Sequence, residues 1–368
     1  MKIGILTFHA SHNYGSMLQA WALQHYLNSI GHDAETINLR IKAQRDKYNF
    51  PLRPIKNRGW IFFKSLLNPL WLYHACRKWW AYEKFLENNL HLTSKAYDSW
   101  QSVKEDLARL GYGCVITGGD QIWNIKCKDY TEAYYLPSDL GIIRKISYSP
   151  SFGPSFLSNI TEQQRNFISK SLSDYSHISV RESSMRQYLS ILLNRDVSQA
   201  CDPTLLLHAE DYSRFITEDP IIKGRYIYYY TPRLNAQSEN LAIKIGKHYG
   251  MKVVTSFPHL YNNKMVSEPE SGPAEFLNLL KNATFVIGKS FHLVVFSLLF
   301  HKDFIAIEGD RDARMRSILE KLHVLERGQV TEDNYMTIKL APIDYNFIDQ
   351  LLEDERQKSI HFLELALS

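Results

Sequence analysis

Short apolar runs alternate with helix-like patterns along most of this 368-residue sequence, and this alternation constrains the fold more than any single motif. Buried strands joined by amphipathic helices are typical of parallel sheets covered by helices. Early in the chain the apolar runs predict strands over residues 2–7, 34–39, 114–117, 145–149 and 177–180. A helix is predicted over 16–30, ended by Gly31, and the capping box of Thr161 and Gln164 predicts another.

A second block of the same kind begins after Cys201-Asp202-Pro203-Thr204, where a proline interrupts the pattern. Strands are predicted over 226–230, 252–256, 284–287 and 304–307, alternating with helices over 236–248, 273–282, 291–301 and 313–322. We therefore predict an α/β protein with two Rossmann-like domains of parallel sheets, residues 1–205 and 206–343, with a cleft between them. By analogy with other two-domain α/β proteins, a last helix over 344–368 packs across both.

The composition excludes several classes of protein. Hydrophobic residues make up 45% of the chain and charged residues 22%, enough apolar side chains for two cores and too many for a disordered chain. The net charge of +4 is too small to make nucleic acid the expected partner. The four cysteines, at 76, 114, 127 and 201, form no CxxC pair, so we expect no metal site, no disulfide framework and a cytoplasmic protein.

No secretion signal or membrane-spanning helix is expected from the sequence. Residues 1–6 read as a strand, without the charged and apolar regions of a signal peptide. The most apolar long stretch, residues 60–76, is interrupted by Lys64, Pro69 and His74, whereas a membrane span needs about 20 mostly apolar residues.

The segment over residues 40–84 is unusually basic and aromatic. It holds eleven lysines and arginines but only Asp46 and Glu83 as acids, and four tryptophans, at 60, 71, 79 and 80. Such a segment suits an anionic membrane surface, giving peripheral contact at the inner face of the cell membrane, or a lipid-linked substrate. The simpler alternative is a helical excursion, residues 40–95, whose aromatics pack on the first domain while its lysines face water.

In open α/β sheets, ligands bind beyond the carboxyl ends of the strands, so the residues after each strand are the candidates for a site. After the first strand come Asn13, Tyr14, Gly15 and Ser16, which open a helix. The backbone N–H groups of such a helix start suit an anion or a sugar hydroxyl. Ordinary helix capping is the alternative reading.

The strand over 114–117 is followed by Gly118-Gly119-Asp120-Gln121-Ile122-Trp123-Asn124. Asp120 and Gln121 can bind sugar hydroxyls, while the ring of Trp123 can cover the apolar C–H face of a sugar. The alternative is a turn in which Asp120 caps the next helix.

Cationic groups follow later strands. Arg181 could hold a phosphate or carboxylate with its planar fork, or form a salt bridge with Glu182 or another acid. Lys289, Ser290 and His292 stand at a strand exit that opens a helix, an arrangement suited to anion binding or proton transfer, although a core histidine is the alternative. Arg314 lies at the next strand-to-helix turn.

Several segments resemble, in the same order, those of the polysaccharide pyruvyl transferase family. These are Asn13-Tyr14-Gly15-Ser16-Met17-Leu18-Gln19-Ala20, Gly118-Gly119-Asp120-Gln121-Ile122-Trp123-Asn124, Ser179-Val180-Arg181-Glu182, Asp202-Pro203-Thr204 and Ser290-Phe291-His292. The resemblance implies a fold similar to glycosyltransferase-B enzymes. It also implies transfer of pyruvate from phosphoenolpyruvate onto two hydroxyls of a sugar in a surface polysaccharide, with release of phosphate and no cofactor.

The resemblance assigns expected roles to the candidates. Arg181, His292, Arg314, Lys289 and Ser290 would bind the donor. The reaction needs an acid and a base, for which His292 is one candidate acid and Asp120 one candidate base. Asn13, Tyr14, Gly15, Ser16, Asp120, Gln121 and Trp123 would bind the acceptor sugar. A sugar-nucleotide-dependent glycosyltransferase of the same fold and a non-catalytic glycan- or anion-binding protein remain alternatives.

Overall fold

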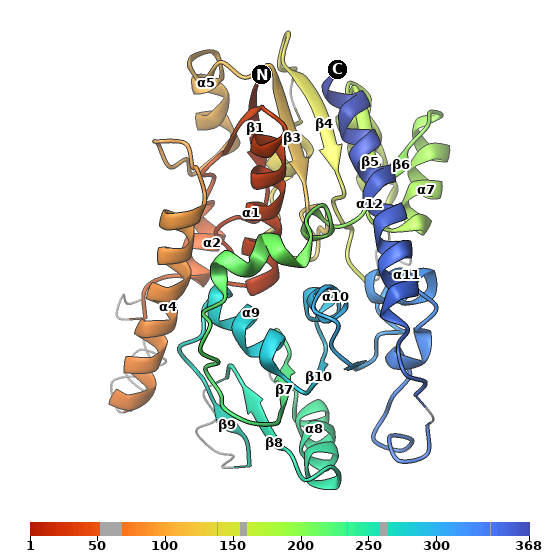
Figure 1. Cartoon of the computed structure of the whole chain (residues 1–368). Helices are drawn as coiled ribbons and strands as arrows, with labels where there is room; N and C mark the ends of the chain where they lie inside the picture. Colours follow the sequence, from red (N-terminus) through yellow and green to blue (C-terminus); the bar gives the residue numbers. More distant parts are fainter. Residues whose placement is uncertain (52–67, 138, 155–159, 234, 258–263, 339) are drawn as a thin grey trace.

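The computed structural model builds the chain around two parallel β-sheets, one above the other in Figure 1. It describes residues 1–51, 68–137, 139–154, 160–233, 235–257, 264–338 and 340–368. Within these ranges the strands form a six-stranded sheet, in the order β2-β1-β3-β4-β5-β6, and a five-stranded sheet, in the order β11-β10-β7-β8-β9. The prediction of an α/β fold with two parallel sheets is confirmed.

The first sheet contains β1 (Lys2–Leu6), β2 (Asp33–Thr36), β3 (Cys114–Gly118), β4 (Arg144–Tyr148), β5 (His177–Val180) and β6 (Ser198–Gln199). Its helices are α1 (Tyr14–Ser29), α2 (Lys42–Lys47), α4 (Pro69–Asn89), α5 (Trp100–Leu110), α6 (Glu162–Leu172) and α7 (Ser183–Leu193). The capping box of Thr161 and Gln164 opens α6 as predicted. The strand β6 and the helix α7 were not expected.

The second sheet contains β7 (Tyr226–Tyr230), β8 (Lys252–Thr255), β9 (Val266–Ser267), β10 (Phe285–Gly288) and β11 (Phe304–Ala306). Its helices are α8 (Ala236–His248), α9 (Pro273–Asn282), α10 (Phe291–Leu299) and α11 (Ala313–Lys321). Between the two sheets the chain passes through short 3-10 helices at Pro203–Leu205 and Ala209–Phe215.

Each sheet has a point where its strand order reverses. In the first sheet the chain leaves β1 toward β2 on one side and later adds β3 on the other, so the reversal lies between β1 and β3. In the second sheet it lies between β7 and β10. Loops diverge at such a point and leave a crevice beyond the carboxyl ends of the strands, which is where ligands of this fold class bind.

One hydrophobic core joins the two sheets. It includes Ile5 of β1, Leu18 of α1, Tyr228 of β7 and Phe276 of α9, all fully buried. The ring of Tyr14 stacks on Phe276 at 4.8 Å between ring centroids. The helix α1 is buried on most of its surface because it lies between the first sheet and the helices of the second.

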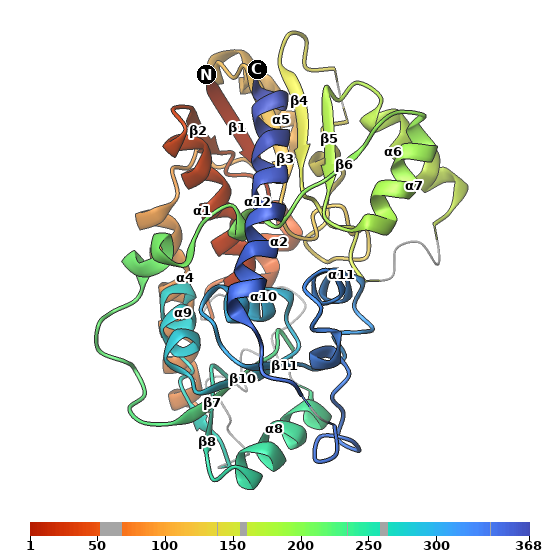
Figure 2. The same cartoon turned by 45° about the vertical axis from the view of Figure 1, so that its right-hand side comes forward.

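The last helix, α12 (Tyr345–Leu367), runs from the level of the second sheet along the first toward the N-terminus (Figure 2). The buried side chain of Arg356 donates from Nε to the carbonyl oxygen of Leu205 at 2.8 Å, and Ser359 Oγ accepts from the backbone N–H of Cys201 at 2.9 Å. Near the second sheet Lys321 of α11 forms an ion pair with Glu355. The helix therefore contacts elements that belong to both sheets.

The basic aromatic segment over 40–84 forms α2 and the long helix α4, and its residues 52–67, with Trp60 and Lys64, lie outside the described part of the chain. The helix α4 reaches the second half of the chain, because Lys78 Nζ donates to the carbonyl oxygen of Ser256 at 2.9 Å and Arg77 pairs with Glu270 at 3.0 Å. The expectation that the lysines of this excursion face water is therefore wrong for Lys78, which binds the second half of the chain. None of the helices described is long and apolar enough to cross a membrane.

Candidate functional site

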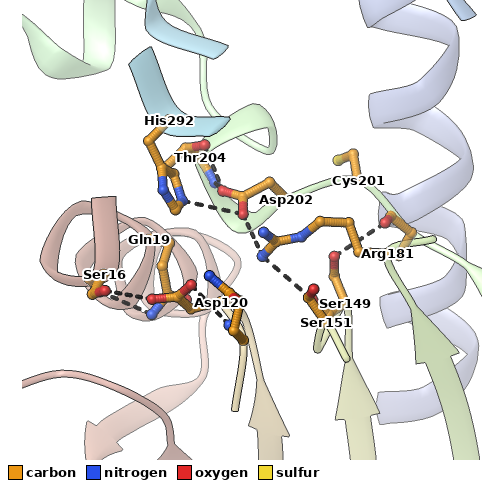
Figure 3. Close-up of polar contacts among 12 residues, drawn as sticks. Ser16, Gln19, Asp120, Ser149, Ser151, Arg181, Cys201, Asp202, Thr204 and His292 are labelled. Atoms are coloured by element: carbon orange, nitrogen blue, oxygen red, sulfur yellow. Dashed lines mark hydrogen bonds and ion pairs between the residues drawn. The ribbon is translucent and has the colours of Figure 1, made fainter. Parts of the chain in front are cut away.

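Side chains from both reversal points meet in one buried group, which we call the charged cluster: Asp120, Arg181, Asp202 and His292 (Figure 3). Asp120 follows β3 and Arg181 follows β5 of the first sheet. His292 lies in the first turn of α10, directly after β10. Asp202 comes from the connection between the two sheets, so the cluster combines residues of both sheets and of their connection.

Asp202 is the centre of the cluster. Its Oδ2 lies 2.5 Å from Arg181 Nη2 and 3.4 Å from His292 Nε2, while Oδ1 accepts from the N–H and hydroxyl of Thr204 at 2.9 and 2.6 Å. Burial alone would raise the pKa of Asp202. The charges of Arg181 and His292 and the hydrogen bonds from Thr204 outweigh burial and hold its pKa well below the usual range. The carboxylate is therefore ionised at neutral pH.

Arg181 is buried with much of its hydrogen-bonding capacity unused. Its guanidinium lies 4.8 Å from the ring centroid of Phe291, and Nη2 reaches Asp202 and the carbonyl oxygen of Ser149. Its Nε and Nη1 have no hydrogen-bond partner among the residues described. Buried donors without partners are rare in folded proteins, and in a crevice they are expected where a ligand completes the site.

His292 is placed by a close approach of the two halves. The ring packs directly on Gly15 in the first turn of α1, where an added Cβ would lie 1.9 Å from His292 Nδ1. Only glycine leaves room for the imidazole at this position. This contact joins the reversal point of the first sheet to that of the second.

Asp120 is held at the other side of the cluster. Its Oδ2 accepts a hydrogen bond from the hydroxyl of Ser16, and Oδ1 accepts from the N–H of Gln121 at 2.8 Å. Its backbone is left-handed, with φ +49°, and Gly119 before it has φ +69°. A Cβ on Gly119 would lie 1.6 Å from Gln19 Oε1, so the turn needs glycine both for its φ and for space.

Arg314 borders the cluster, whereas Lys289 does not join it through any contact in the described residues. Arg314 and Arg181 line one cavity of about 50 Å³, but Arg314 also binds Asp312 through Nε and Nη2 at 3.0 and 2.6 Å. Burial would lower the pKa of Arg314, yet Asp312, with Asp120 and Glu182 farther away, raises it. Lys289 forms a partly exposed ion pair with Glu308.

Ser290 is the residue before α10, and within the described chain its hydroxyl does not cap that helix. It is nearly buried, at 8% exposure. It stands two residues before His292 in the sequence, but among the described residues no hydrogen bond joins the two side chains.

The helix start at Asn13–Ser16 differs from the expected anion site. The side chain of Asn13 accepts the N–H groups of Gly15 and Ser16 at 3.0 and 3.2 Å, so the donors predicted to face a ligand already have a partner. Ordinary capping is the correct reading there. Tyr14 is fully buried, and its hydroxyl donates to the carbonyl oxygen of Ser271 at 2.9 Å, so it joins the two halves instead of facing an acceptor.

The expected role of Trp123 as a sugar platform is also wrong. The indole is fully buried, stacked on Tyr135 at 5.0 Å and packed against Phe152 at 5.2 Å, and its Nε1 donates to the carbonyl oxygen of Tyr134. Its faces are therefore covered by protein. Gln121 remains partly exposed, and its Oε1 accepts from Asn124 Nδ2 at 2.9 Å.

Sequence reasoning gave no site role to Asp202, Thr204 or Glu182, which lie in the cluster or beside it. Glu182 was named only as an alternative salt-bridge partner of Arg181, and the acid that pairs with Arg181 is Asp202. Asp202-Pro203-Thr204 was read as an interdomain passage, although an aspartate two residues before a threonine is a pattern for local capping. Glu182 is buried, and burial raises its pKa, while a hydrogen bond from Ser151 and the charges of Arg181 and Arg314 oppose that rise. Within the described residues no group of three or more histidines, cysteines or acids is arranged to hold a metal ion.

Solved structures of other proteins share the fold of this chain. Arabidopsis thaliana UGT89C1, complexed with UDP-L-rhamnose, is 11% identical with a TM-score of 0.52, covering 100% of this chain and 98% of that one. A protein described as a UDP-N-acetylglucosamine 2-epimerase from Listeria monocytogenes is 9% identical with a TM-score of 0.51, covering 99% and 97%. At these identities the likeness shows a shared glycosyltransferase-B-like fold alone.

The sequence itself gives the family. No curated protein matches it at a significant level. A family model described as Polysaccharide pyruvyl transferase matches residues 13–311, a range that contains the whole charged cluster. The chain belongs to the polysaccharide pyruvyl transferase family.

Proposed function

We propose that this protein transfers pyruvate from phosphoenolpyruvate onto two hydroxyls of a sugar in a surface polysaccharide or its lipid-linked precursor. The product is a cyclic ketal, and phosphate is released. The buried guanidinium of Arg181, with two nitrogens that have no hydrogen-bond partner among the described residues and a cavity shared with Arg314, is the observation that carries the donor assignment. Membership of the family supports the reaction class.

Phosphoenolpyruvate carries a phosphate and a carboxylate on a small enol, so its site needs fixed cations at two positions. Arg181 and Arg314 line the same cavity and can serve the two groups. That cavity, about 50 Å³, is smaller than ordinary ligand pockets of about 300 to 1,000 Å³. Donor binding therefore requires one of two changes. Either the ion pair of Arg181 with Asp202 or that of Arg314 with Asp312 loosens, or the two halves of the molecule move apart.

The chemistry needs one acid and one base near the enol. A first sugar hydroxyl adds to C2 of the enol while C3 gains a proton, for which His292 is the proposed donor. The C2–O bond to phosphate then breaks and a second hydroxyl adds to C2. The proton from one sugar hydroxyl thus restores the proton that His292 delivered to C3. The proton from the other sugar hydroxyl leaves on phosphate. Asp120, hydrogen-bonded to Ser16, is the proposed base.

Alanine variants of Arg181, His292 and Arg314 test the donor site by calorimetric titration with phosphoenolpyruvate. Losing a charged partner of a bound anion costs about 2 to 5 kcal/mol, so each variant should bind or turn over the donor at least about tenfold less well. Arg181→Lys should stay well below wild type, because lysine keeps the charge and loses the fork. Arg316→Ala is the matched control, since Arg316 is exposed on the same helix as Arg314. Unchanged affinity and turnover in any two of the three alanine variants would remove the assignment.

The alternative functions give different results with purified protein. A sugar-nucleotide-dependent transferase would be stabilised against heat by nucleotide sugars and not by phosphoenolpyruvate. A non-catalytic binder would release no phosphate from phosphoenolpyruvate with any glycan. We expect turnover to persist in EDTA, because arginine side chains supply the positive charge at the donor, and complete metal-reversible loss would contradict this.

A further inference from the structure

We infer that a pocket between α2, α4 and the loop after β1 binds a sugar ring of the acceptor glycan, an inference that rests on the proposed function. The pocket has a volume of about 420 Å³, within the range of small-molecule sites. It lies outside the charged cluster and shares no lining residue with the cavity beside Arg181.

Aromatic rings set at steep angles form one side of this pocket. The rings of Phe50 and Trp79 lie 5.0 Å apart at 79°, and those of Trp79 and Trp80 lie 5.2 Å apart at 87°. Trp79 is fixed by a hydrogen bond from Nε1 to the carbonyl oxygen of Tyr48 at 2.9 Å. Trp80 is 49% exposed at the rim, which leaves an indole surface free to cover the C–H face of a sugar.

Charged and amide groups line the same pocket. Glu83 accepts from His12 Nε2 at 2.8 Å and from Arg40 Nη1 at 3.1 Å, so its carboxylate is held in place. Gln44 is 3% exposed, and its Oε1 has no hydrogen-bond partner among the described residues. Arg45 is exposed and forms no ion pair with another described residue. Fixed polar groups and aromatic rings in one pocket suit the hydroxyl and C–H surfaces of a sugar.

Other ligand classes fit this pocket less well. A cationic ligand, which aromatic rings can also hold, would meet Arg40 and Arg45. A flat membrane surface would need the aromatic side chains to project outward, whereas Trp79 lines a concave site and is only partly exposed. The concave shape and the mixture of groups therefore favour a sugar.

The pocket lies close to the charged cluster along the chain. Ala10 lines the pocket, His12 binds Glu83, and Gly15 and Ser16 meet His292 and Asp120 of the cluster. Both sites therefore border the exit of β1, and both cartoon views show α2 beside the start of α1 (Figures 1 and 2). A glycan seated in the pocket would extend from there toward the proposed reacting groups.

Saturation-transfer NMR on the full chain tests the pocket with methyl glycosides of glucose, galactose, mannose and N-acetylglucosamine. At least one glycoside should give a signal with wild-type protein, reduced at least fivefold in Trp80→Ala and largely retained in Trp80→Phe. Tyr73→Ala is the matched control, since Tyr73 is 55% exposed on the same helix and outside the pocket. Circular dichroism melting confirms that each variant is folded.

Titration of the same variants with phosphoenolpyruvate separates the two proposals. Unchanged donor affinity in Trp80→Ala, with lost sugar binding, supports the pocket as an acceptor site. Failure of the wild type to bind phosphoenolpyruvate would remove the donor proposal and leave the Trp80-dependent sugar signal standing. Equal sugar signals in wild type and Trp80→Ala, or no signal in wild type, would overturn the pocket. Loss of binding to phosphatidylglycerol vesicles in Trp80→Ala, with sugar signals unchanged, would assign Trp80 to a membrane surface instead.

Discussion

The contact between Gly15 and His292 joins the two halves of the molecule at the candidate site. An alanine at Gly15 would place its Cβ 1.9 Å from His292 Nδ1, so the histidine or the helix α1 would have to move. The proposed acid would then lose its position relative to Asp202. A single methyl group is thus enough to test the geometry of the cluster.

We expect Gly15→Ala to lower the free energy of unfolding by about 1 to 3 kcal/mol, because overpacking of a buried contact costs that much. Donor turnover should fall as well. Gly113→Ala is the control, since the nearest atom to its new Cβ would be Met1 Sδ at 3.5 Å. Urea unfolding of the two variants measures the effect, and equal stabilities would contradict the close contact.

Asp202 should make stability depend on pH in a defined direction. Its pKa is held below the unfolded value of about 3.9, so its contribution is complete above that pH and is lost as the pH falls toward the folded pKa. Asp202→Asn should cost roughly 3 kcal/mol at pH 7, because it leaves Arg181 buried without a counter-charge. Unfolding free energies at pH 7, 5 and 3.5 should show this difference shrinking only below about pH 4. A difference that is constant over the range would argue against the pairing.

Individual site residues were only partly predictable from the sequence. Arg181, His292 and Asp120 were found because each follows a strand, and parallel strands bring such positions together. Trp123 was misassigned because Tyr135 covers it, and no local pattern around Trp123 reveals that a residue twelve positions later folds over the indole. Asp202 was passed over because its importance comes from partners at Arg181 and His292, which are distant in the chain.

At the scale of elements, long apolar runs were predictable and two-residue strands were not. The strand β5 and the helices α8 and α9 begin and end at the predicted residues, because apolar spacing and caps mark them locally. The strands β6 and β9 each have two residues, and their pairing with β5 and β8 is decided by the sheet around them. The contacts of α12 with the connection between the sheets depend on Arg356 and Ser359, whose burial no periodicity shows.

Arg356→Met should destabilise the attachment of α12. The guanidinium donates to the carbonyl oxygens of Leu205 and Leu207 at 2.8 and 3.3 Å, and each buried carbonyl left unpaired costs about 1 to 3 kcal/mol. Lys358→Met on the same helix is the control, since the Lys358 side chain is 68% exposed, and it should change stability by less than about 0.5 kcal/mol. Chemical unfolding that gives the two variants equal midpoints would show that Arg356 does not anchor the helix.

For the whole molecule, the shared core argues against independent halves. Ile5 of the first sheet, Tyr228 of the second and Leu363 of α12 belong to one buried cluster. We expect scanning calorimetry to show a single unfolding transition, with calorimetric and van't Hoff enthalpies that agree. Two resolved transitions would mean that the halves fold separately despite their common core.

The pairing of Asp202 with Arg181 also bears on how anions enter and leave. An anion that binds Arg181 replaces Asp202 as its counter-ion. The net binding free energy is therefore the difference between the two ion pairs. Inorganic phosphate, with one charged group, gains little from this exchange, whereas phosphoenolpyruvate can also engage Arg314. As phosphate departs, the carboxylate of Asp202 pairs with Arg181 again. This pairing favours release of the product in the proposed reaction. Phosphate should accordingly be a weak competitor of the donor.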